Sequence, residues 1–96
     1  MKMCMLVYAE AADESIIAAV KEAGISGYTK MIEARGEGTQ TEPKLGTHIW
    51  PGKNNVLFFT LPDEELARIR EHIRKLESEN PHAGVRLFIM PLDESL

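Results

Sequence analysis

Four segments of the chain carry the hydrophobic pattern of β-strands. Residues 3–8 are a continuous apolar run of strand length, residues 56–61 are a dense apolar run rich in strand formers, and residues 85–90 are expected to form the final strand. The run at 3–8 is expected to be buried on both faces. Residues 28–35 alternate instead, which places successive side chains on opposite faces of an extended chain. The residues expected on one of these faces are Tyr28, Lys30, Ile32 and Ala34.

Two further segments show the spacing of amphipathic helices. The first begins at Asp13, which is expected to cap the helix, and ends at Gly24, because glycine commonly terminates helices. The second opens at Pro62-Asp63 and ends at the break formed by residues 80–84. Its apolar positions, three or four residues apart, are Leu66, Ile69, Ile73 and Leu76.

The order of these segments is strand, helix, strand, strand, helix, strand, which is the split pattern of a ferredoxin-like domain. We therefore expect an α+β fold, βαββαβ, with a four-stranded antiparallel sheet and two helices on one face. With 96 residues, of which 44% are hydrophobic, the chain is expected to form a single domain over residues 1–96. Apolar side chains are expected on both faces of the sheet, so a homo-oligomer is expected to cover the face without helices. These side chains are Phe58, Phe59, Phe88 and the methionines of residues 3–8.

Charge and cysteine content narrow the classes of function. A formal net charge of -4 and a pI near 5.3 provide no general attraction to nucleic acid or to anionic lipid. The single cysteine, Cys4, cannot form an intrachain disulfide, and the N-terminal residues lack the pattern of a secretory signal. No apolar run is long enough to span a bilayer. We therefore expect a cytoplasmic protein with no nucleic-acid partner and no membrane insertion.

The long polar connection at residues 36–53 is the first candidate for function. Most connections in compact domains have roughly 4 to 6 residues, and much longer ones are frequently functional. Gly36 and Gly38 allow backbone amides to approach an anion closely, although both also suit a turn that needs glycine geometry. The cations in and beside this segment have two interpretations. They converge on a phosphate or carboxylate ligand, or they are solvated surface charges. They are Arg35, Lys44 and Lys53.

Trp50 and His48 lie in the same connection, and each has more than one interpretation. Trp50 is expected to contact a neighbouring subunit, with stacking on a ligand or packing over its own loop as alternatives. The three histidines and Cys4 match no zinc or copper spacing, although three copies of His48 in an assembly could bridge a metal. No acidic residue of this region is tied by spacing to a nucleophile, a histidine or a metal, so no enzymatic activity is expected.

Three glycine-containing motifs stand at the boundaries of the predicted strands. Gly27-Tyr28-Thr29 opens the second strand, Gly36-Glu37-Gly38-Thr39-Gln40 follows it, and Gly84-Val85-Arg86 leads into the last strand. These motifs resemble the Gly-Leu-Thr, the Gly-Phe-Gly-Arg-Gln and the glycine-containing loop with its basic residue in the nitrogen-regulatory PII superfamily. Members of that superfamily are trimeric ferredoxin-like signalling proteins that bind small effectors in clefts between subunits. The resemblance covers most of the chain and includes Pro62-Asp63.

The resemblance implies an adenine-nucleotide site for ATP, ADP or AMP. The implied cofactor-binding positions are Thr29, Gly36, Gly38, Gln40 and Arg86, to which the loop adds Lys53. The chain departs from the family pattern at Thr39, which replaces an arginine, and it lacks most of the Thr-Gly and Gly-Asp-Gly-Lys phosphate-binding elements. Its effector loop is also shortened and contains no tyrosine for modification.

The function implied by the resemblance is regulatory rather than enzymatic. A PII-like homotrimer would bind a small anionic effector in an intersubunit cleft and regulate a partner protein. The alternative on the same fold is a trimeric divalent-metal-binding protein of the CutA kind, which would use His48 and carboxylates. An acylphosphatase is disfavoured, because residues 9–12 read Ala-Glu-Ala-Ala where that enzyme has a glycine-rich anion loop.

Overall fold

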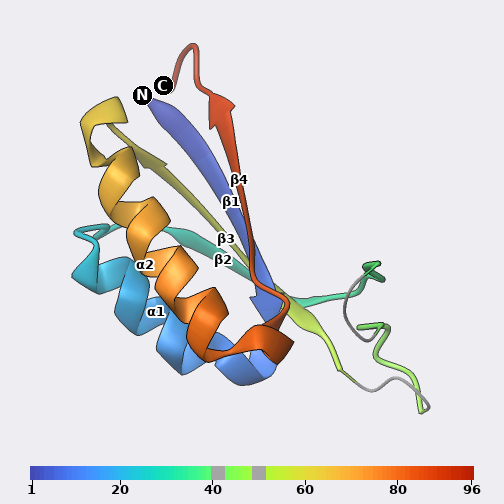
Figure 1. The fold of residues 1–96 in the computed structure, drawn as a ribbon. Coiled ribbons are helices and arrows are strands. Elements are labelled where there is room, and N and C mark those ends of the chain that lie inside the picture. The colour runs from blue at the N-terminus through green and yellow to red at the C-terminus, as the bar shows by residue number, and fades with distance from the viewer. Residues whose placement is uncertain (40–42, 49–51) are drawn as a thin grey trace.

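The computed structural model describes residues 1–39, 43–48 and 52–96. Its elements, in chain order, are β1 (Lys2–Ala9), α1 (Asp13–Glu22), β2 (Thr29–Ala34), β3 (Asn54–Leu61), α2 (Leu66–Glu79) and β4 (Arg86–Pro91). Short 3₁₀ turns, η1 (Glu10–Ala12), η2 (Asp63–Glu65) and η3 (Pro81–Ala83), precede α1, α2 and β4. The strands form one antiparallel sheet in the order β2-β3-β1-β4, with both helices on one face (Figure 1). The predicted ferredoxin-like fold is confirmed.

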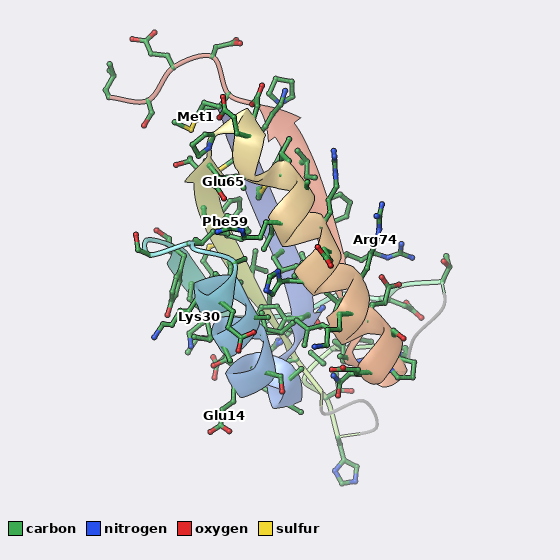
Figure 2. All side chains as sticks on the ribbon, turned by 60° about the vertical axis from the view of Figure 1, so that its left-hand side comes forward. Met1, Glu14, Lys30, Phe59, Glu65 and Arg74 are labelled. Carbon is green, nitrogen blue, oxygen red and sulfur yellow. The ribbon has the colours of Figure 1, made fainter. Side chains whose placement is uncertain are left out.

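The hydrophobic core lies between the sheet and the two helices. Alternate residues of β1, namely Cys4, Leu6 and Tyr8, have no exposed surface and face the helices. Helix α1 adds Ile16 and Val20, and helix α2 adds Ile69, Ile73 and Leu76. In Figure 2, Phe59 lies between sheet and helices, whereas the charged side chains of Glu14 and Arg74 point outward. No helix in the described part of the chain is long and apolar enough to cross a membrane.

The opposite face of the sheet is apolar and is not covered by the helices. The register places Met5 of β1 between Phe58 of β3 and Phe88 of β4, and Met3 beside Met90. Met3, Met5 and Val7 are only partly buried, so in the single chain the run at 3–8 is fully buried on one face and not on both as predicted. We call this surface the open sheet face and define it by Met3, Met5, Met31, Phe58, Phe88 and Met90.

A β-bulge interrupts β2 and overturns part of the predicted alternation. Met31 pairs with Val56 and Ala34 pairs with Asn54, so two residues of β2 lie opposite one residue of β3. Glu33, one of those two, has a left-handed backbone with φ of 60°. The prediction that Lys30 and Ala34 share a face is therefore wrong, because one extra residue reverses the alternation beyond it.

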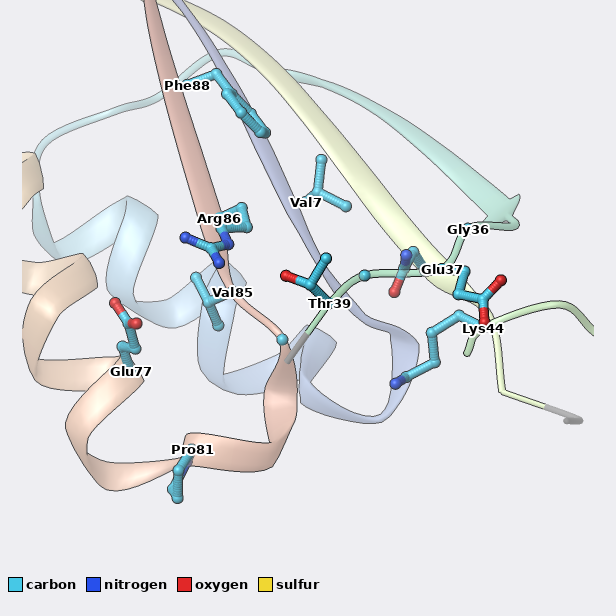
Figure 3. A pocket seen from close by; sticks show the side chains of 13 residues that line it. Val7, Gly36, Glu37, Thr39, Lys44, Glu77, Pro81, Val85, Arg86 and Phe88 are labelled. Carbon is cyan, nitrogen blue, oxygen red and sulfur yellow. The ribbon is translucent and has the colours of Figure 1, made fainter. Parts of the chain in front are cut away.

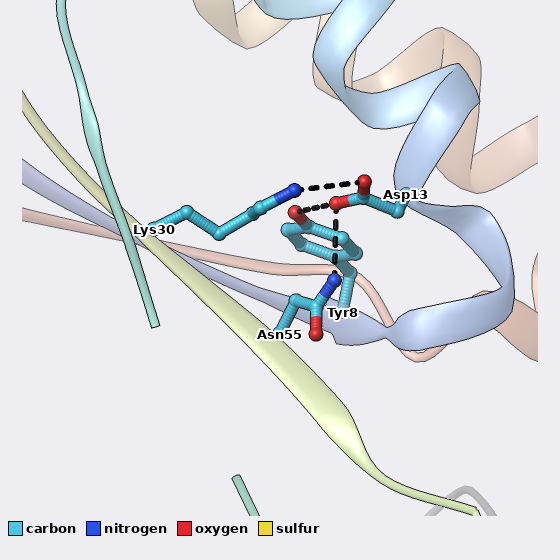
Figure 4. A network of polar contacts seen from close by, with 4 residues as sticks. All are labelled: Tyr8, Asp13, Lys30 and Asn55. Atoms are coloured by element: carbon cyan, nitrogen blue, oxygen red, sulfur yellow. Dashed lines mark hydrogen bonds and ion pairs between the residues drawn. The ribbon is translucent and has the colours of Figure 1, made fainter. Parts of the chain in front are cut away.

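Asp13 joins α1 to three strands instead of capping the helix. The N-cap position is Ala12, which makes no side-chain capping hydrogen bond, so the predicted capping role of Asp13 is wrong. The Asp13 carboxylate accepts hydrogen bonds from Tyr8 Oη at 2.6 Å and Asn55 Nδ2 at 3.0 Å. It also accepts one from Lys30 Nζ at 3.0 Å (Figure 4). We call these four residues the Asp13 network, and its donors on β1, β2 and β3 occupy the oxygens that a capping residue would use.

Candidate functional site

A pocket with a volume of about 330 Å³ lies at the end of the sheet from which the chain enters the long connection. It brings residues 36–39, which follow β2, against Gly84, Val85 and Arg86 at the start of β4 (Figure 3). We call it the loop pocket. The remaining side chains that line it are Val7, Lys44, Asn54, Glu77, Pro81 and Phe88. Two of the glycine-containing motifs, nearly fifty positions apart in sequence, thus form one concave surface.

Backbone contacts hold the two sides of the connection together near the pocket. Gly36 and Lys44 exchange two backbone hydrogen bonds, each of 2.7 Å, and this bridge places Lys44 at the pocket. Gly84 has a left-handed backbone with φ of 63°, which glycine adopts without steric cost. It ends η3 and turns the chain into β4, so that Arg86, the first residue of that strand, lines the pocket.

The ionisable side chains of the loop pocket are two cations and two carboxylates. Arg86 of β4 and Glu77 of α2 lie on one side, and Lys44 and Glu37 lie on the other (Figure 3). An arginine and a lysine in a concave site favour phosphate or carboxylate ligands through charge-assisted hydrogen bonds. The two carboxylates reduce the attraction of the site for highly charged anions.

The structure brings half of the predicted binding residues together. Gly36, Gly38 and Arg86 all line the loop pocket. The sequence interpretation did not include Glu77, because charges on an amphipathic helix normally mark its solvated face. Its position three residues before Asn80, where the helix breaks beside the Gly84 turn, was the available signal.

The other predicted residues lie elsewhere or outside the described residues. Thr29 lies on the edge strand β2, where it pairs with Phe58 of β3, and it does not line the pocket. Lys53 Nζ lies 3.5 Å from Glu33 Oε1, in an ion pair, and Lys53 also does not line the pocket. The predicted roles of Gln40 and Trp50 fall outside the described residues.

The three cations predicted to converge lie along one backbone bridge of the connection. Gly46 N donates a hydrogen bond to Gly52 O at 3.1 Å. A Cβ atom at Gly46 would stand 2.9 Å from Arg35 Nε and 3.1 Å from Lys53 Cε, and one at Gly52 would stand 2.9 Å from Lys44 Cδ. Small residues therefore let these side chains lie against the backbone, and Lys44 is the cation among them that lines the loop pocket.

The metal alternative has no preformed cluster in a single chain. Among the side chains that the structure describes, no three histidine, cysteine, aspartate or glutamate residues are grouped to hold an ion. Cys4 is fully buried, and this burial raises the pKa of its thiol. A raised pKa disfavours the thiolate that metal binding and nucleophilic chemistry require. His48 is exposed within the described part of the connection.

Comparison with known proteins identifies relatives of this fold. The structure is similar to CPII from Thiomonas intermedia K12 bound to ADP and bicarbonate, with a TM-score of 0.74, 17% identity, and coverage of 92% of this chain and 81% of that chain. CPII bound to ADP, AMP and acetate gives a TM-score of 0.75 at 16% identity, covering 99% of this chain and 88% of that chain. At these identities the likeness establishes the shared fold.

A second relative and a family model bear on the sequence itself. A PII-like signalling protein from Thermus thermophilus has a TM-score of 0.65 and 28% identity, with coverage of 92% of this chain and 82% of that chain. No curated protein sequence matches the chain. The model of the family described as nitrogen regulatory protein P-II matches residues 1–96. The chain therefore belongs to the nitrogen regulatory protein P-II family.

Proposed function

We propose that this chain is a cytoplasmic regulatory protein that binds a small anionic effector, an adenine nucleotide such as ATP, ADP or AMP, and thereby regulates a partner protein without catalysing a reaction. The observation that carries this proposal is the loop pocket, in which glycine backbone at Gly36 and Gly38 meets the guanidinium of Arg86. A ligand changes a conformation only through contacts that differ between two states. An effector that touches residues 36–39 acts directly on the start of the long connection.

The presence of glycine at position 36 is better explained by a bound ligand than by the geometry of a turn. The described glycines with positive φ are Gly24, Gly46 and Gly84, so the backbone at Gly36 is one that other residues adopt. A Cβ atom at Gly36 would meet only Asn54 Nδ2, at an ordinary distance of 3.8 Å. Nothing around Gly36 in the described part of the chain therefore requires glycine, whereas close approach of a ligand to the backbone does.

The cleft is completed by a second subunit in this proposal. Strand β2, which carries Thr29, and strand β4, which carries Arg86, form opposite edges of the sheet, so one chain does not bring both to one ligand. In a homotrimer packed through the open sheet face, Thr29 of a neighbouring chain adds to the loop pocket. Gln40 and Lys53 stay predicted contacts of the same cleft. CPII from Thiomonas intermedia K12 was solved with ADP, AMP and bicarbonate, which are anions of the expected kind.

Loss of Arg86 tests the proposed site. Arg86→Ala is expected to weaken nucleotide binding about 10- to 100-fold, because a hydrogen bond to a charged group is lost from the pocket. Calorimetric titration of tag-free protein with AMP, ADP, ATP, 2-oxoglutarate, bicarbonate and divalent metals measures the change. Arg74→Ala is the matched control, since Arg74 is an exposed arginine on α2 that does not line the loop pocket.

The pattern of responses separates the alternatives. Equal losses in Arg86→Ala and Arg74→Ala would show that net charge, not the loop pocket, determines binding. Saturable binding of a divalent metal without any nucleotide response would favour the CutA-like alternative. Thermal unfolding of both variants without ligand checks that neither has lost its fold, and a bound effector raises the midpoint of the wild type in the same experiment.

A further inference from the structure

Glu77 is an unexpected residue in a pocket for an anion. It projects from the last turns of α2 toward the side of the loop pocket where Arg86 lies (Figure 3). Glu77 and Arg86 also line, with Arg74, a second groove between α2 and β4, so the two cavities share the same carboxylate and guanidinium. Glu77 and Arg86 therefore line both cavities together.

The second carboxylate, Glu37, stands on the other side of the pocket beside Lys44. With two cations and two carboxylates, the ionisable lining of the loop pocket has no formal net charge. A single phosphate group can bind at Arg86 by charge-assisted hydrogen bonds. Glu77 lies on the same side of the pocket as Arg86 (Figure 3), so its carboxylate repels a phosphate group that is held there. This repulsion grows with the charge of the ligand, so removing the charge of Glu77 benefits a triphosphate more than a monophosphate.

We infer that Glu77 is a specificity-determining residue that lowers the affinity of the loop pocket for a nucleoside triphosphate relative to the corresponding monophosphate. The inference rests on the proposed function and adds to it the class of ligand. Glu77 does so by placing a negative charge on the side of the pocket where Arg86 would hold a phosphate group (Figure 3). Such exclusion of a competing ligand by an unfavourable charge is a common source of specificity.

Glu77→Gln tests the inference, because glutamine keeps the size of the side chain and removes its charge. The affinities of AMP, ADP and ATP are measured by calorimetric titration without magnesium, since the cation would neutralise the phosphates. Glu77→Gln is expected to raise the ATP-to-AMP affinity ratio about three- to fivefold, as is usual for one exposed charge pair. The change is expected to shrink at 1 M salt, where charges are screened within about 3 Å.

Glu79→Gln is the matched control. Glu79 lies two residues further along α2 and lines the groove between α1 and α2 instead of the loop pocket. Both variants change the net charge by the same amount, so a changed ratio in Glu77→Gln alone supports the inference. An unchanged ratio, or an equal gain for AMP and ATP, overturns the inference and leaves the proposed function standing. Failure of every nucleotide to bind the wild type and both variants overturns the proposed function itself.

Discussion

Phe58→Asp is expected to convert the proposed trimer into folded monomers. Phe58 lies on central strand β3 beside Met5, in the middle of the open sheet face. An exposed apolar surface of this kind on a small protein usually marks an interface. A carboxylate placed in that interface would lose its water without gaining a partner, which strongly opposes assembly. Light scattering coupled to gel filtration measures the effect, since a trimer has three times the 10.8 kDa mass of one chain.

Two further variants show whether a lower mass reflects the open sheet face. Phe58→Leu keeps an apolar side chain and is expected to stay trimeric. Ser15→Asp adds the same charge at an exposed position on α1, which lies on the helical side, and is also expected to stay trimeric. Far-ultraviolet circular dichroism checks that Phe58→Asp is folded. A wild-type monomer, or a Phe58→Asp protein that keeps the trimer mass, would exclude assembly through this face.

Asp13→Ala is expected to lower the free energy of unfolding by about 3 kcal/mol, because it removes the acceptor at the centre of the Asp13 network. Tyr8 is fully buried and Asn55 is 5% exposed, so water cannot readily replace the carboxylate as their partner. The same change also leaves Lys30 without its ion pair. Urea unfolding followed by circular dichroism measures the loss. The matched control, Glu14→Ala, removes an exposed acidic side chain from the adjacent position and is expected to change stability by less than about 0.5 kcal/mol.

The pH dependence of stability is a second measurement on the same variant. Partial burial alone would raise the pKa of Asp13, but hydrogen bonds from Tyr8, Lys30 and Asn55 lower it overall. Its stabilising effect is therefore present above the unfolded-state pKa of about 3.9 and is lost as the pH falls further. Asp13→Ala is expected to lack this acid-side loss.

Tyr8 is expected to determine how stability changes with pH on the alkaline side. Burial raises the pKa of Tyr8, and the hydrogen bond to Asp13 and its negative charge raise it further. The associated stability is present below the unfolded-state pKa of about 10 and is lost as the pH rises above that value. Tyr8→Phe is expected to remove this alkaline loss. Parallel pH profiles for wild type and both variants would show that the Asp13 network does not contribute through its charges.

Much of the fold could be predicted from local pattern. Helix α2 has apolar residues such as Ile69 and Ile73 at helical spacing, and these are the residues it buries. The strands β1 and β3 are likewise predictable from their apolar runs, because strands and helices differ in the periodicity of their apolar residues. The bulge at Glu33 was missed because it depends on how β2 pairs with β3, and pairing is a contact between distant segments.

The candidate site also has features that the sequence predicts and features that depend on tertiary contacts. Short motifs predict Gly36, Gly38 and Arg86 as binding residues, because each motif consists of contiguous residues and is visible in the sequence alone. That Arg86 lies close to residues 36–39 depends on the turn at Gly84 and on β4 pairing with β1. The glycine of the turn is visible in the sequence, whereas the pairing of β4 with β1 is a contact between distant segments and has no local signature.

Local sequence patterns specify the order of strands and helices, the apolar character of both sheet faces and the glycine motifs of the P-II family. These properties are written in neighbouring residues, which share a local periodicity. Packing of separate elements brings Asp13 against Lys30 and Asn55 of the sheet. It also places Glu77 with Arg86 at the loop pocket. These residues belong to different strands and helices, and they meet because packing the helices onto the sheet fixes which polar groups lie together.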